Sequence, residues 1–326
     1  YELAGPLLDH LIKTENVTWA LINSIESWRW PEMLHQHGIP CVMLIHEFAT
    51  YCTENDAFIN ACLWSTEVVL SSPATHADMK RVFPELEETP IELQPQGRCQ
   101  IPGHTFQTES ISPTTPFHLC SIPVLNECHR EEWLDTCSLI VGSGTLTPRK
   151  GADLFISVCN RVIRTTTQPV LCLWLAGPDR TSDYKGTRMW CDDQIRRSGI
   201  EGRVVIIHAH EHYESLMRRA DLFLLTSRLD PLPNVTLDSL HNGIPTLTFS
   251  QASGTASWLE LDPWLSERCV APYLDTNAMA EQAQHLLNNR NERMKVGSKV
   301  KDLAQKTFSM RNYNQQIRSL GNFCIE

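Results

Sequence analysis

One short segment limits the folds open to this chain more than any other. It begins with an apolar run, Asp221 to Leu225, that is typical of a parallel strand buried on both faces. Pro231 and Pro233 follow, and two prolines so close together exclude a strand or helix interior and predict a stiff loop. Leucines then recur at helical spacing until Gly243 ends the helix. The sequence therefore predicts a strand–loop–helix unit, the repeating element of α/β folds.

Two carboxylates flank this corner. Asp230 precedes the prolines, and Asp238 lies on the predicted helix. The backbone N–H groups at the start of such a helix attract an anion, above all a phosphate. The residues alone leave two interpretations open. Either the acids belong to a ligand site, or Asp230 opens a turn and Asp238 lies on a solvated helix face.

The same segment resembles a known family. Asp230 and Asp238 are separated by seven residues and are followed by Gly243-Ile244-Pro245. This arrangement is similar to the E-x7-E signature of the retaining family 4 glycosyltransferases, although both acids are aspartates where the family usually has glutamates. The resemblance implies an α/β protein with the GT-B fold, in which two Rossmann-like, doubly wound domains face each other across a cleft.

A glycine-rich turn in the second half of the chain extends the resemblance. Residues 138–142 predict a strand, and the turn after it ends in Arg149-Lys150-Gly151 at the head of an amphipathic helix. Glycines let the backbone approach a ligand closely, and two adjacent cations suit a diphosphate. Lys150 matches the family lysine that contacts the donor diphosphate; otherwise it is a solvated lysine at a helix start. Gly144 stands where the family has an arginine, and Arg149 or Arg180 is the candidate replacement.

Strands and helices also alternate in the first half. Apolar runs such as Ile39 to Ile45 predict buried parallel strands in a doubly wound sheet. His46 follows that run, at a strand end where ligands of open α/β sheets bind. In the family a histidine in a similar place lies near the donor sugar, while the alternative is a histidine hydrogen-bonded at a strand end. No strand and glycine-rich loop of the family kind precede Gly5, so we expect an incomplete N-terminal domain.

A stretch rich in proline, serine and threonine, from Ile101 to Pro123, predicts a linker or loop. We therefore expect an N-terminal, acceptor-side domain of residues 1–125 and a C-terminal, nucleotide-sugar-binding domain of residues 126–307. Residues 308–326 resemble the C-terminal helix that returns to the N-terminal domain in GT-B proteins.

Alternating histidines at positions 208, 210 and 212 follow another predicted strand. A metal site would need all three on one face and a further ligand nearby, and a polar loop fits the pattern better. In similar enzymes this loop borders the nucleotide base, so His208 or His210 is expected to stack on the base or to form a hydrogen bond with it. We expect no metal site.

Composition narrows the choice of partners and compartment. The chain has 326 residues and a formal net charge of −10, which argues against nucleic-acid binding. No apolar run is long enough to span a membrane. The 12 cysteines include several inside apolar runs and form no C-x-x-C pair, which favours free thiols in the cytoplasm. Peripheral association with the inner face of a membrane, or with a larger assembly, remains compatible with these numbers.

The resemblance implies a role for each candidate residue. The expected catalytic residues are Asp230, which contacts the donor sugar, Lys150, which stabilises the leaving diphosphate, and His46, from the opposite domain. Asp238 is expected to bind the ribose hydroxyls. The other expected donor-binding residues are Arg149, Leu232, Pro233, Asn234, Val235, Gly144, His208 and Gly254. No cofactor is expected beyond the nucleotide-diphospho-sugar itself.

The expected function is therefore transfer of a sugar from a nucleotide-diphospho-sugar to a glycan, lipid-linked or other acceptor, with retention of configuration and without a metal. Polysaccharide biosynthesis is the family's usual setting. Two alternatives remain open: a non-catalytic nucleotide-sugar-binding or interaction domain of a larger assembly, and another GT-B enzyme such as a sugar-nucleotide 2-epimerase.

Overall fold

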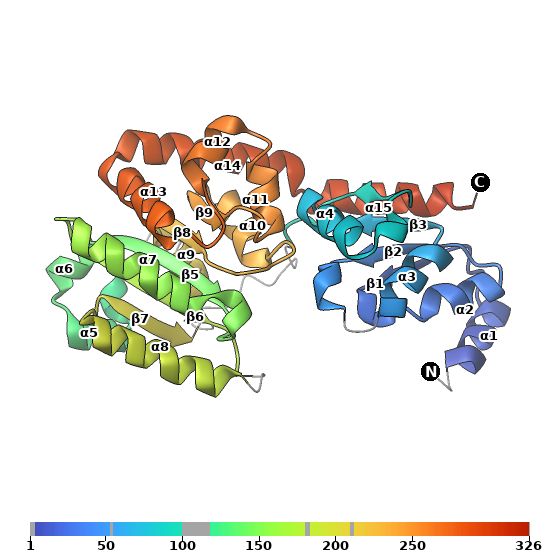
Figure 1. Ribbon diagram of the computed structural model, residues 1–326, viewed down its shortest axis with the longest axis horizontal. Coiled ribbons are helices and arrows are strands. Elements are labelled where there is room, and N and C mark those ends of the chain that lie inside the picture. The colour runs from blue at the N-terminus through green and yellow to red at the C-terminus, as the bar shows by residue number, and fades with distance from the viewer. Residues whose placement is uncertain (1–3, 53–54, 100–117, 180–182, 209–211, 326) are drawn as a thin grey trace. The chain divides into compact units, whose positions relative to one another are not determined.

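The computed structural model describes residues 4–52, 55–99, 118–179, 183–208 and 212–325 (Figure 1). The chain divides into two compact units. Unit 1 comprises Tyr1–Gly97 and Phe308–Glu326, and unit 2 comprises Arg98–Thr307. Each unit has its own parallel β-sheet and its own hydrophobic core.

Unit 2 is built on a six-stranded parallel sheet with the strand order β10-β9-β8-β5-β6-β7. The strands are β5 Ser138–Gly144, β6 Val170–Ala176, β7 Val204–His208, β8 Leu222–Leu225, β9 Thr246–Phe249 and β10 Val270–Ala271. The chain starts at the centre of the sheet, builds outward to β7, and then returns to add β8 on the other side of β5. The strand order therefore reverses between β5 and β8, as in doubly wound nucleotide-binding folds.

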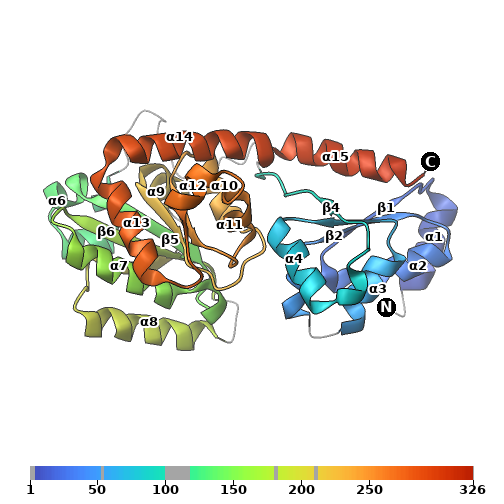
Figure 2. The same cartoon turned by 45° about the horizontal axis from the view of Figure 1, so that its top comes forward.

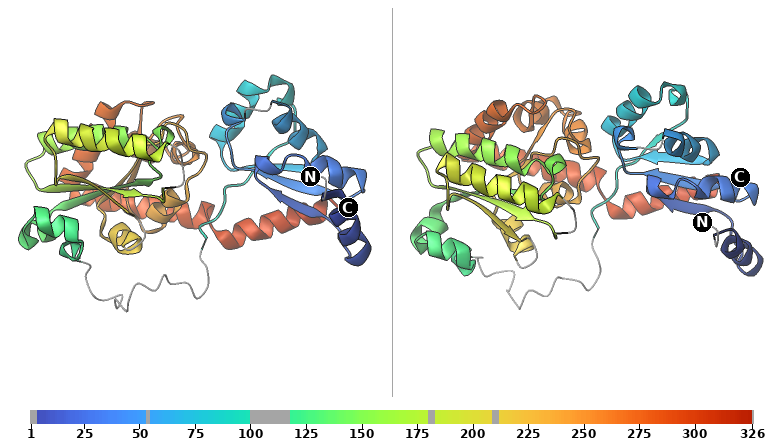
Figure 3. Two further views of the ribbon diagram at one scale, coloured as in Figure 1. Left: turned by 90° about the horizontal axis from the view of Figure 1, so that it is seen from below. Right: turned by 60° about the horizontal axis from the view of Figure 1, so that its bottom comes forward.

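Helices cover both faces of this sheet. One face packs against α7 Ala152–Thr165, with α8 Tyr184–Ser198 and α13 Thr276–Asn288 beside it. The opposite face packs against α5 Pro123–Cys128, α6 Glu131–Thr136, α9 Tyr213–Arg219 and the start of α10 Asn234–His241. Figure 3 shows α8 in yellow-green on one side of the strands and the green α5 and α6 on the other. Burial on both faces explains why these strands are continuous apolar runs in the sequence.

Unit 1 is simpler. Its four parallel strands lie in chain order: β1 Ala20–Asn23, β2 Cys41–Ile45, β3 Glu67–Leu70 and β4 Glu92–Leu93. Right-handed crossovers between strands in chain order place all the connecting helices on one face. These helices are α2 Trp30–Gln36, α3 Asn55–Trp64 and α4 Pro73–Val82, and α1 Ala4–Thr14 packs into the same core. The described part of unit 1 therefore resembles one half of a doubly wound arrangement.

The other face of this sheet is covered by the end of the chain. Alternate strand residues point to the two faces, so Val42 and Leu44 of β2 lie opposite Met43 and Ile45. Val42 and Leu44 form a separate cluster with Ile317 of α15 Met310–Phe323. Figure 2 shows α15 on one side of the sheet and α2 to α4 on the other.

The division into units differs from the expected boundary at residue 125. Leu119, Ile122 and Leu125 are buried in the core of unit 2. These three apolar side chains anchor the described end of the proline-rich stretch to unit 2, whereas the sequence boundary assigned them to the N-terminal domain.

Most predicted helices and strands are present within a few residues of their predicted bounds, with two differences. From the sequence, residues 125–134 predict one helix rich in acids. This prediction is wrong, because the structure has α5 Pro123–Cys128 and α6 Glu131–Thr136 with extended backbone between them. The segment after α11 Gly254–Leu259 was not predicted and forms α12 Pro263–Cys269 and β10; α14 Arg290–Thr307 completes unit 2.

The cysteines are free thiols, as the sequence favours. All 12 cysteines are free, and those in apolar runs, such as Cys41, Cys159 and Cys172, are buried. Across the described ranges, none of the helices combines the length and apolar character that a membrane crossing requires.

Candidate active site

The candidate site lies at the carboxyl ends of β5 and β8. These strands are hydrogen-bonded neighbours, with Ile140 opposite Leu222 and Val141 opposite Phe223. Their chains leave the sheet in different directions, since β5 leads to α7 on one face and β8 leads to α10 on the other. In open α/β sheets a crevice forms at such a point, and ligands bind there.

The two loops at this point are fastened together. Gly151 ends the 3-10 turn of residues 148–150 with φ of 70°, a left-handed conformation that favours glycine. A Cβ atom there would lie 2.0 Å from the carbonyl oxygen of Thr226, whose hydroxyl donates to the carbonyl oxygen of Gly151 at 2.8 Å. Arg228 adds a two-pronged ion pair with Asp153, at 2.9 and 2.7 Å. The loops after β5 and β8 therefore form one rigid corner.

Asp230 and Lys150 meet in this corner. Lys150 Nζ donates to Asp230 Oδ2 at 2.6 Å, and the Arg149 guanidinium lies 3.5 Å from Asp230 Oδ1. Ser227 Oγ donates to Oδ2 at 3.0 Å. Only 5 % of the Asp230 side chain is exposed, compared with 18 % for Lys150 and 39 % for Arg149. The aspartate therefore lies beneath the two cations and directs them, and the cluster keeps one net positive charge.

Gly144 leaves room for the side chain of Lys150. It is the last residue of β5, and a Cβ atom there would approach the Lys150 stem to 3.3 Å. The absence of a side chain at position 144 thus gives space to Lys150. Arg149 lies in the same corner, whereas Arg180 falls outside the described residues. Beside the cations is a cavity of about 460 Å³ lined by Thr145, Thr147, Pro148, Arg149, Lys150 and Asp183.

Asp238 lies on α10 and is held by two residues that the motifs did not indicate. Arg98 Nε donates to Asp238 Oδ1 at 2.7 Å, and the Tyr213 hydroxyl donates to Oδ2 at 3.0 Å. Burial and the neighbouring carboxylate raise the pKa of Tyr213, so the phenol stays protonated. Both carboxylate oxygens therefore have a donor already, with lone pairs left for a further donor on each. Arg98 is 140 positions away in the sequence, so no local spacing could have revealed it.

The start of α10 has the predicted proline corner. Pro233 is the N-cap, Asn234 and Val235 open the helix, and the first turn carries no acidic side chain. Leu232 is buried, and the N–H of Thr236 donates to the Pro233 carbonyl oxygen within the helix start. The helix end is thus compatible with an anion near its first residues.

Gly254 approaches the corner through its backbone. Its N–H donates to the Asp230 carbonyl oxygen at 3.2 Å, and the Asp230 N–H donates to the Ala252 carbonyl oxygen at 2.8 Å. The turn after β9 therefore holds the backbone of Asp230, and Gly254 lies behind that residue.

The two candidate histidines belong to other elements, His208 to unit 2 and His46 to unit 1. His208 is the exposed last residue of β7, two strands away from β5 at the same edge of the sheet. His46 lies in unit 1 after β2, and its Nε2 is 2.7 Å from Asn23 Oδ1. Burial lowers the pKa of His46, so its imidazole is neutral near pH 7.

A group of possible metal ligands occurs among the described residues at a different place. His118, Glu131 and Asp135 have ligand atoms within 4.8 Å of one another, and all three are exposed. They precede β5 in the chain and therefore lie toward its amino end, away from Lys150. His210 lies outside the described residues.

Comparisons with known proteins agree with this architecture. The sequence model of the family "Glycosyl transferases group 1" matches residues 130–303, which is more than half of the chain. No curated protein matches the sequence significantly.

Several solved structures have a similar fold. The N-terminal domain of Candida albicans trehalose-6-phosphate phosphatase superposes with a TM-score of 0.75 at 15 % identity, over 97 % of this chain and 72 % of that one. Sucrose-phosphate synthase from Thermosynechococcus elongatus gives 0.71 at 16 %, over 97 % and 76 %. HepE from Anabaena, in complex with UDP and glucose, gives 0.71 at 16 %, over 97 % and 81 %. Identities this low establish only the fold, which is GT-B. The sequence model, which matches more than half of the residues, establishes the family: the chain belongs to the glycosyl transferases of group 1.

Proposed function

We propose that this protein transfers a sugar from a nucleotide-diphospho-sugar to an acceptor hydroxyl, with retention of anomeric configuration. The observation that carries the proposal is the Asp230–Lys150–Arg149 cluster at the point where the strand order of unit 2 reverses. In the reaction, the bond between the anomeric carbon and the diphosphate oxygen breaks. A bond to the acceptor oxygen forms, and the acceptor proton is released.

The cluster suits the charge that develops in this reaction. Negative charge grows on the leaving diphosphate, and cations fixed in advance stabilise it without having to reorganise. Asp230 accepts one N–H of Lys150, so two donors of the ammonium group remain for phosphate oxygens. We therefore assign Asp230 the role of positioning Lys150, in addition to the predicted contact with the donor sugar.

The remaining features support a nucleotide donor. The start of α10 offers its positive helix end to a phosphate, and Asp238 has lone pairs for the ribose hydroxyls. A solved structure of similar fold, that of HepE, contains UDP-glucose, so a uridine donor is the first to test. The similarity of the Asp230-x7-Asp238 motif to the family 4 signature supports retention. Because Lys150 and Arg149 can offset the diphosphate charge, we propose that transfer needs no divalent metal.

The decisive experiment compares Lys150→Ala with Lys306→Ala, a change at an exposed lysine of α14. The full chain is offered UDP-, GDP- and ADP-sugars with a panel of acceptors, with and without a chelator. We expect Lys150→Ala to abolish transfer and weaken nucleotide binding while circular dichroism shows a folded protein. Lys306→Ala and the chelator should change little.

Full transfer by Lys150→Ala would refute the assigned role. Nucleotide binding by the wild type without transfer or hydrolysis would instead favour a non-catalytic binding domain. The configuration of the product, determined by NMR, tests retention.

A further inference from the structure

Four side chains that carry metal-ligand atoms gather beside α6, toward the amino end of β5 and away from Lys150. One ligand atom each of His118, Glu131 and Asp135 lies within 4.8 Å of the other two. Cys120 adds a thiol, whose Sγ lies 3.6 Å from Glu131 Oε1. We call these four residues the α6 cluster. His118 is 17 positions from Asp135 in the sequence, so no short motif indicates the cluster.

The ligand residues are attached to a buried base. His118 directly precedes the 3-10 turn Leu119–Ser121, in which Leu119 is buried in the core of unit 2. Glu131 and Asp135 are four positions apart on α6 and therefore lie on the same side of that helix. Leu134, between them, is buried in the same core. Because the backbone is already fixed on both sides, binding of an ion has to order only the side chains.

The distances between ligand atoms match those of a tetrahedral zinc site. Zinc bonds of about 2.0–2.2 Å to nitrogen or oxygen and about 2.3 Å to sulfur separate two ligand atoms by about 3.4 Å for nitrogen and oxygen, and by about 3.6 Å for sulfur and oxygen. His118 Nδ1 lies 3.4 Å from Asp135 Oδ1, and Cys120 Sγ lies 3.6 Å from Glu131 Oε1. A direct N–H···O bond is usually about 2.9–3.0 Å long. The nitrogen–oxygen pair is thus spaced for a shared ion rather than for a short hydrogen bond.

The two carboxylates of the α6 cluster are not neutralised by a basic side chain. Other acids of unit 2 are, as Asp153 is by Arg228. Within the described ranges, Glu131 and Asp135 form no ion pair with lysine or arginine, and the one ion pair of the cluster joins Asp135 to His118 at 3.4 Å. Two neighbouring carboxylates repel each other, and a divalent cation between them removes that repulsion.

The chemistry of the ligands selects the kind of ion. Imidazole and thiolate are ligands of zinc and of similar transition metals, whereas Mg²⁺ and Ca²⁺ prefer oxygen ligands. A site with four protein ligands keeps no open position for a substrate, and this closed arrangement is typical of structural zinc.

We propose that the α6 cluster is a structural binding site for zinc or a similar divalent transition metal. His118, Glu131 and Asp135 supply three of the ligands. Cys120 supplies the fourth after its thiol proton is released to solvent. The ion fastens residues 118–121 to α6, where the chain enters the described core of unit 2. This inference is independent of the transferase function, and it revises the expectation of no metal site at this one place.

The test is zinc binding by the full chain after bound metal has been removed, with the affinity measured by competition with a chromogenic chelator. We expect the wild type to bind one Zn²⁺ ion more tightly than any other. His118→Ala and Asp135→Asn should each weaken this binding at least about tenfold, because even the partners of metal ligands contribute that much. His10→Ala and Glu88→Gln remove the same groups at exposed positions of unit 1. These matched controls should leave the affinity unchanged, and circular dichroism checks that every variant is folded.

Substitution of the zinc by cobalt tests the geometry of the site. Four-coordinate Co²⁺ absorbs strongly in the visible range, and a thiolate ligand adds a charge-transfer band in the near ultraviolet. We expect both features in the wild type and loss of the charge-transfer band in Cys120→Ser. A wild-type spectrum without this band would remove Cys120 from the ligand set.

Three further results would overturn the inference: no zinc retained by the wild type against the chelator, zinc affinity that His118→Ala and Asp135→Asn leave unchanged, or equal losses in the two controls. Sugar transfer and nucleotide binding are measured on the zinc-loaded and zinc-free protein. Equal values support a structural ion, and transfer that requires zinc would refute the structural role.

Discussion

Asp238 shows how the site depends on individual residues that the motifs do not contain. Its carboxylate is about one quarter exposed and accepts from Arg98 and Tyr213. A hydrogen bond to a charged group contributes roughly 1.5–3 kcal/mol, and an unpaired partner left in a half-buried place costs a similar amount. The pair therefore ties Arg98 to α10 and orients the carboxylate for a ribose.

We predict that Asp238→Ala lowers the free energy of unfolding by roughly 1–3 kcal/mol and raises the nucleotide dissociation constant, because two donors lose their acceptor. Tyr213→Phe should cost roughly 1.5–3 kcal/mol, since it removes one donor to the charged carboxylate. The double variant should cost less than the sum, because the two side chains share one bond. Urea denaturation measures the cycle, and strict additivity would show that the Tyr213–Asp238 bond contributes nothing.

At the scale of the elements, the corner that carries Lys150 depends on a single glycine. Gly151 has a left-handed backbone and would place a Cβ atom 2.0 Å from the Thr226 carbonyl oxygen. The glycines of this turn predicted a close approach of the backbone to a ligand. They could not predict that Gly151 packs against the loop after β8, because that contact joins segments 75 positions apart.

We predict that Gly151→Ala lowers the unfolding free energy by roughly 2 kcal/mol or more, from left-handed strain and the clash together. It should also lower nucleotide affinity, since Lys150 moves with the turn. Gly186→Ala in α8 is the control: its Cβ would meet nothing within 4 Å, and alanine favours a helix by roughly 0.5–1 kcal/mol. Thermal unfolding should therefore move in opposite directions for the two variants, and equal shifts would contradict the packing argument.

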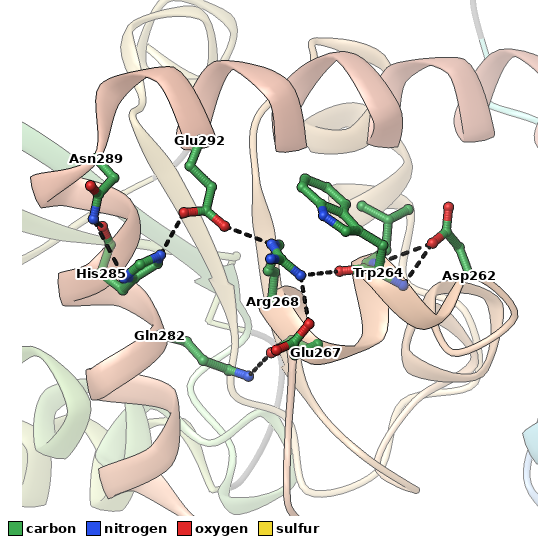
Figure 4. A network of polar contacts seen from close by, with 9 residues as sticks. Asp262, Trp264, Glu267, Arg268, Gln282, His285, Asn289 and Glu292 are labelled. Atoms are coloured by element: carbon green, nitrogen blue, oxygen red, sulfur yellow. Dashed lines mark hydrogen bonds and ion pairs between the residues drawn. The ribbon is translucent and has the colours of Figure 1, made fainter.

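A second group of elements, α12, α13 and α14, is joined by one acid. Glu292 accepts from Arg268 Nε at 2.6 Å and is 2.6 Å from His285 Nε2 (Figure 4). Arg268 also lies over the Trp264 ring at 4.3 Å. Hydrogen bonds from His285 and Arg268 lower the pKa of Glu292 below its usual value. The acid therefore bridges three helices in its charged form.

Because the pKa of Glu292 is lowered in the folded state, the contribution of this residue to stability depends on pH. Its contribution to stability is present above the unfolded-state pKa of about 4.5 and disappears as the pH falls through the lower folded-state value. We predict that Glu292→Gln costs about 1 kcal/mol at pH 7, discounted for the part-exposed site. The difference from wild type should shrink steadily below about pH 4.5. Denaturant titrations across this range measure it, and a difference that grows in acid would exclude the bridge.

For the whole molecule, the sequence was informative where structure is repetitive. Continuous apolar runs predicted both parallel sheets, because strands covered on two faces must be apolar throughout. The motifs predicted Lys150 and Asp230, which the structure brings to 2.6 Å. Contacts between distant segments were not predictable in this way, and neither were the short elements α12 and β10, which are too brief to show a period.

The hydrophobic clusters of the two units are separate from each other. The face of the unit 1 sheet opposite α2 to α4 is covered by α15, where Ile317 is 4 % exposed against Val42, Leu44 and Val69. Every member of this cluster belongs to unit 1. Loss of Ile317 should therefore weaken unit 1 without a direct effect on the core of unit 2.

We predict that Ile317→Ala destabilises unit 1 by about 2–4 kcal/mol, the usual cost of a cavity at a buried isoleucine. Hydrogen exchange with mass spectrometry should show faster exchange in β1 to β3 and unchanged exchange in β5, β6 and β8. Phe323→Ala on the same helix removes a side chain that is 66 % exposed and should leave both units unaffected. Equal acceleration in both sheets after Ile317→Ala would mean that the units unfold as one cooperative body, in spite of their separate cores.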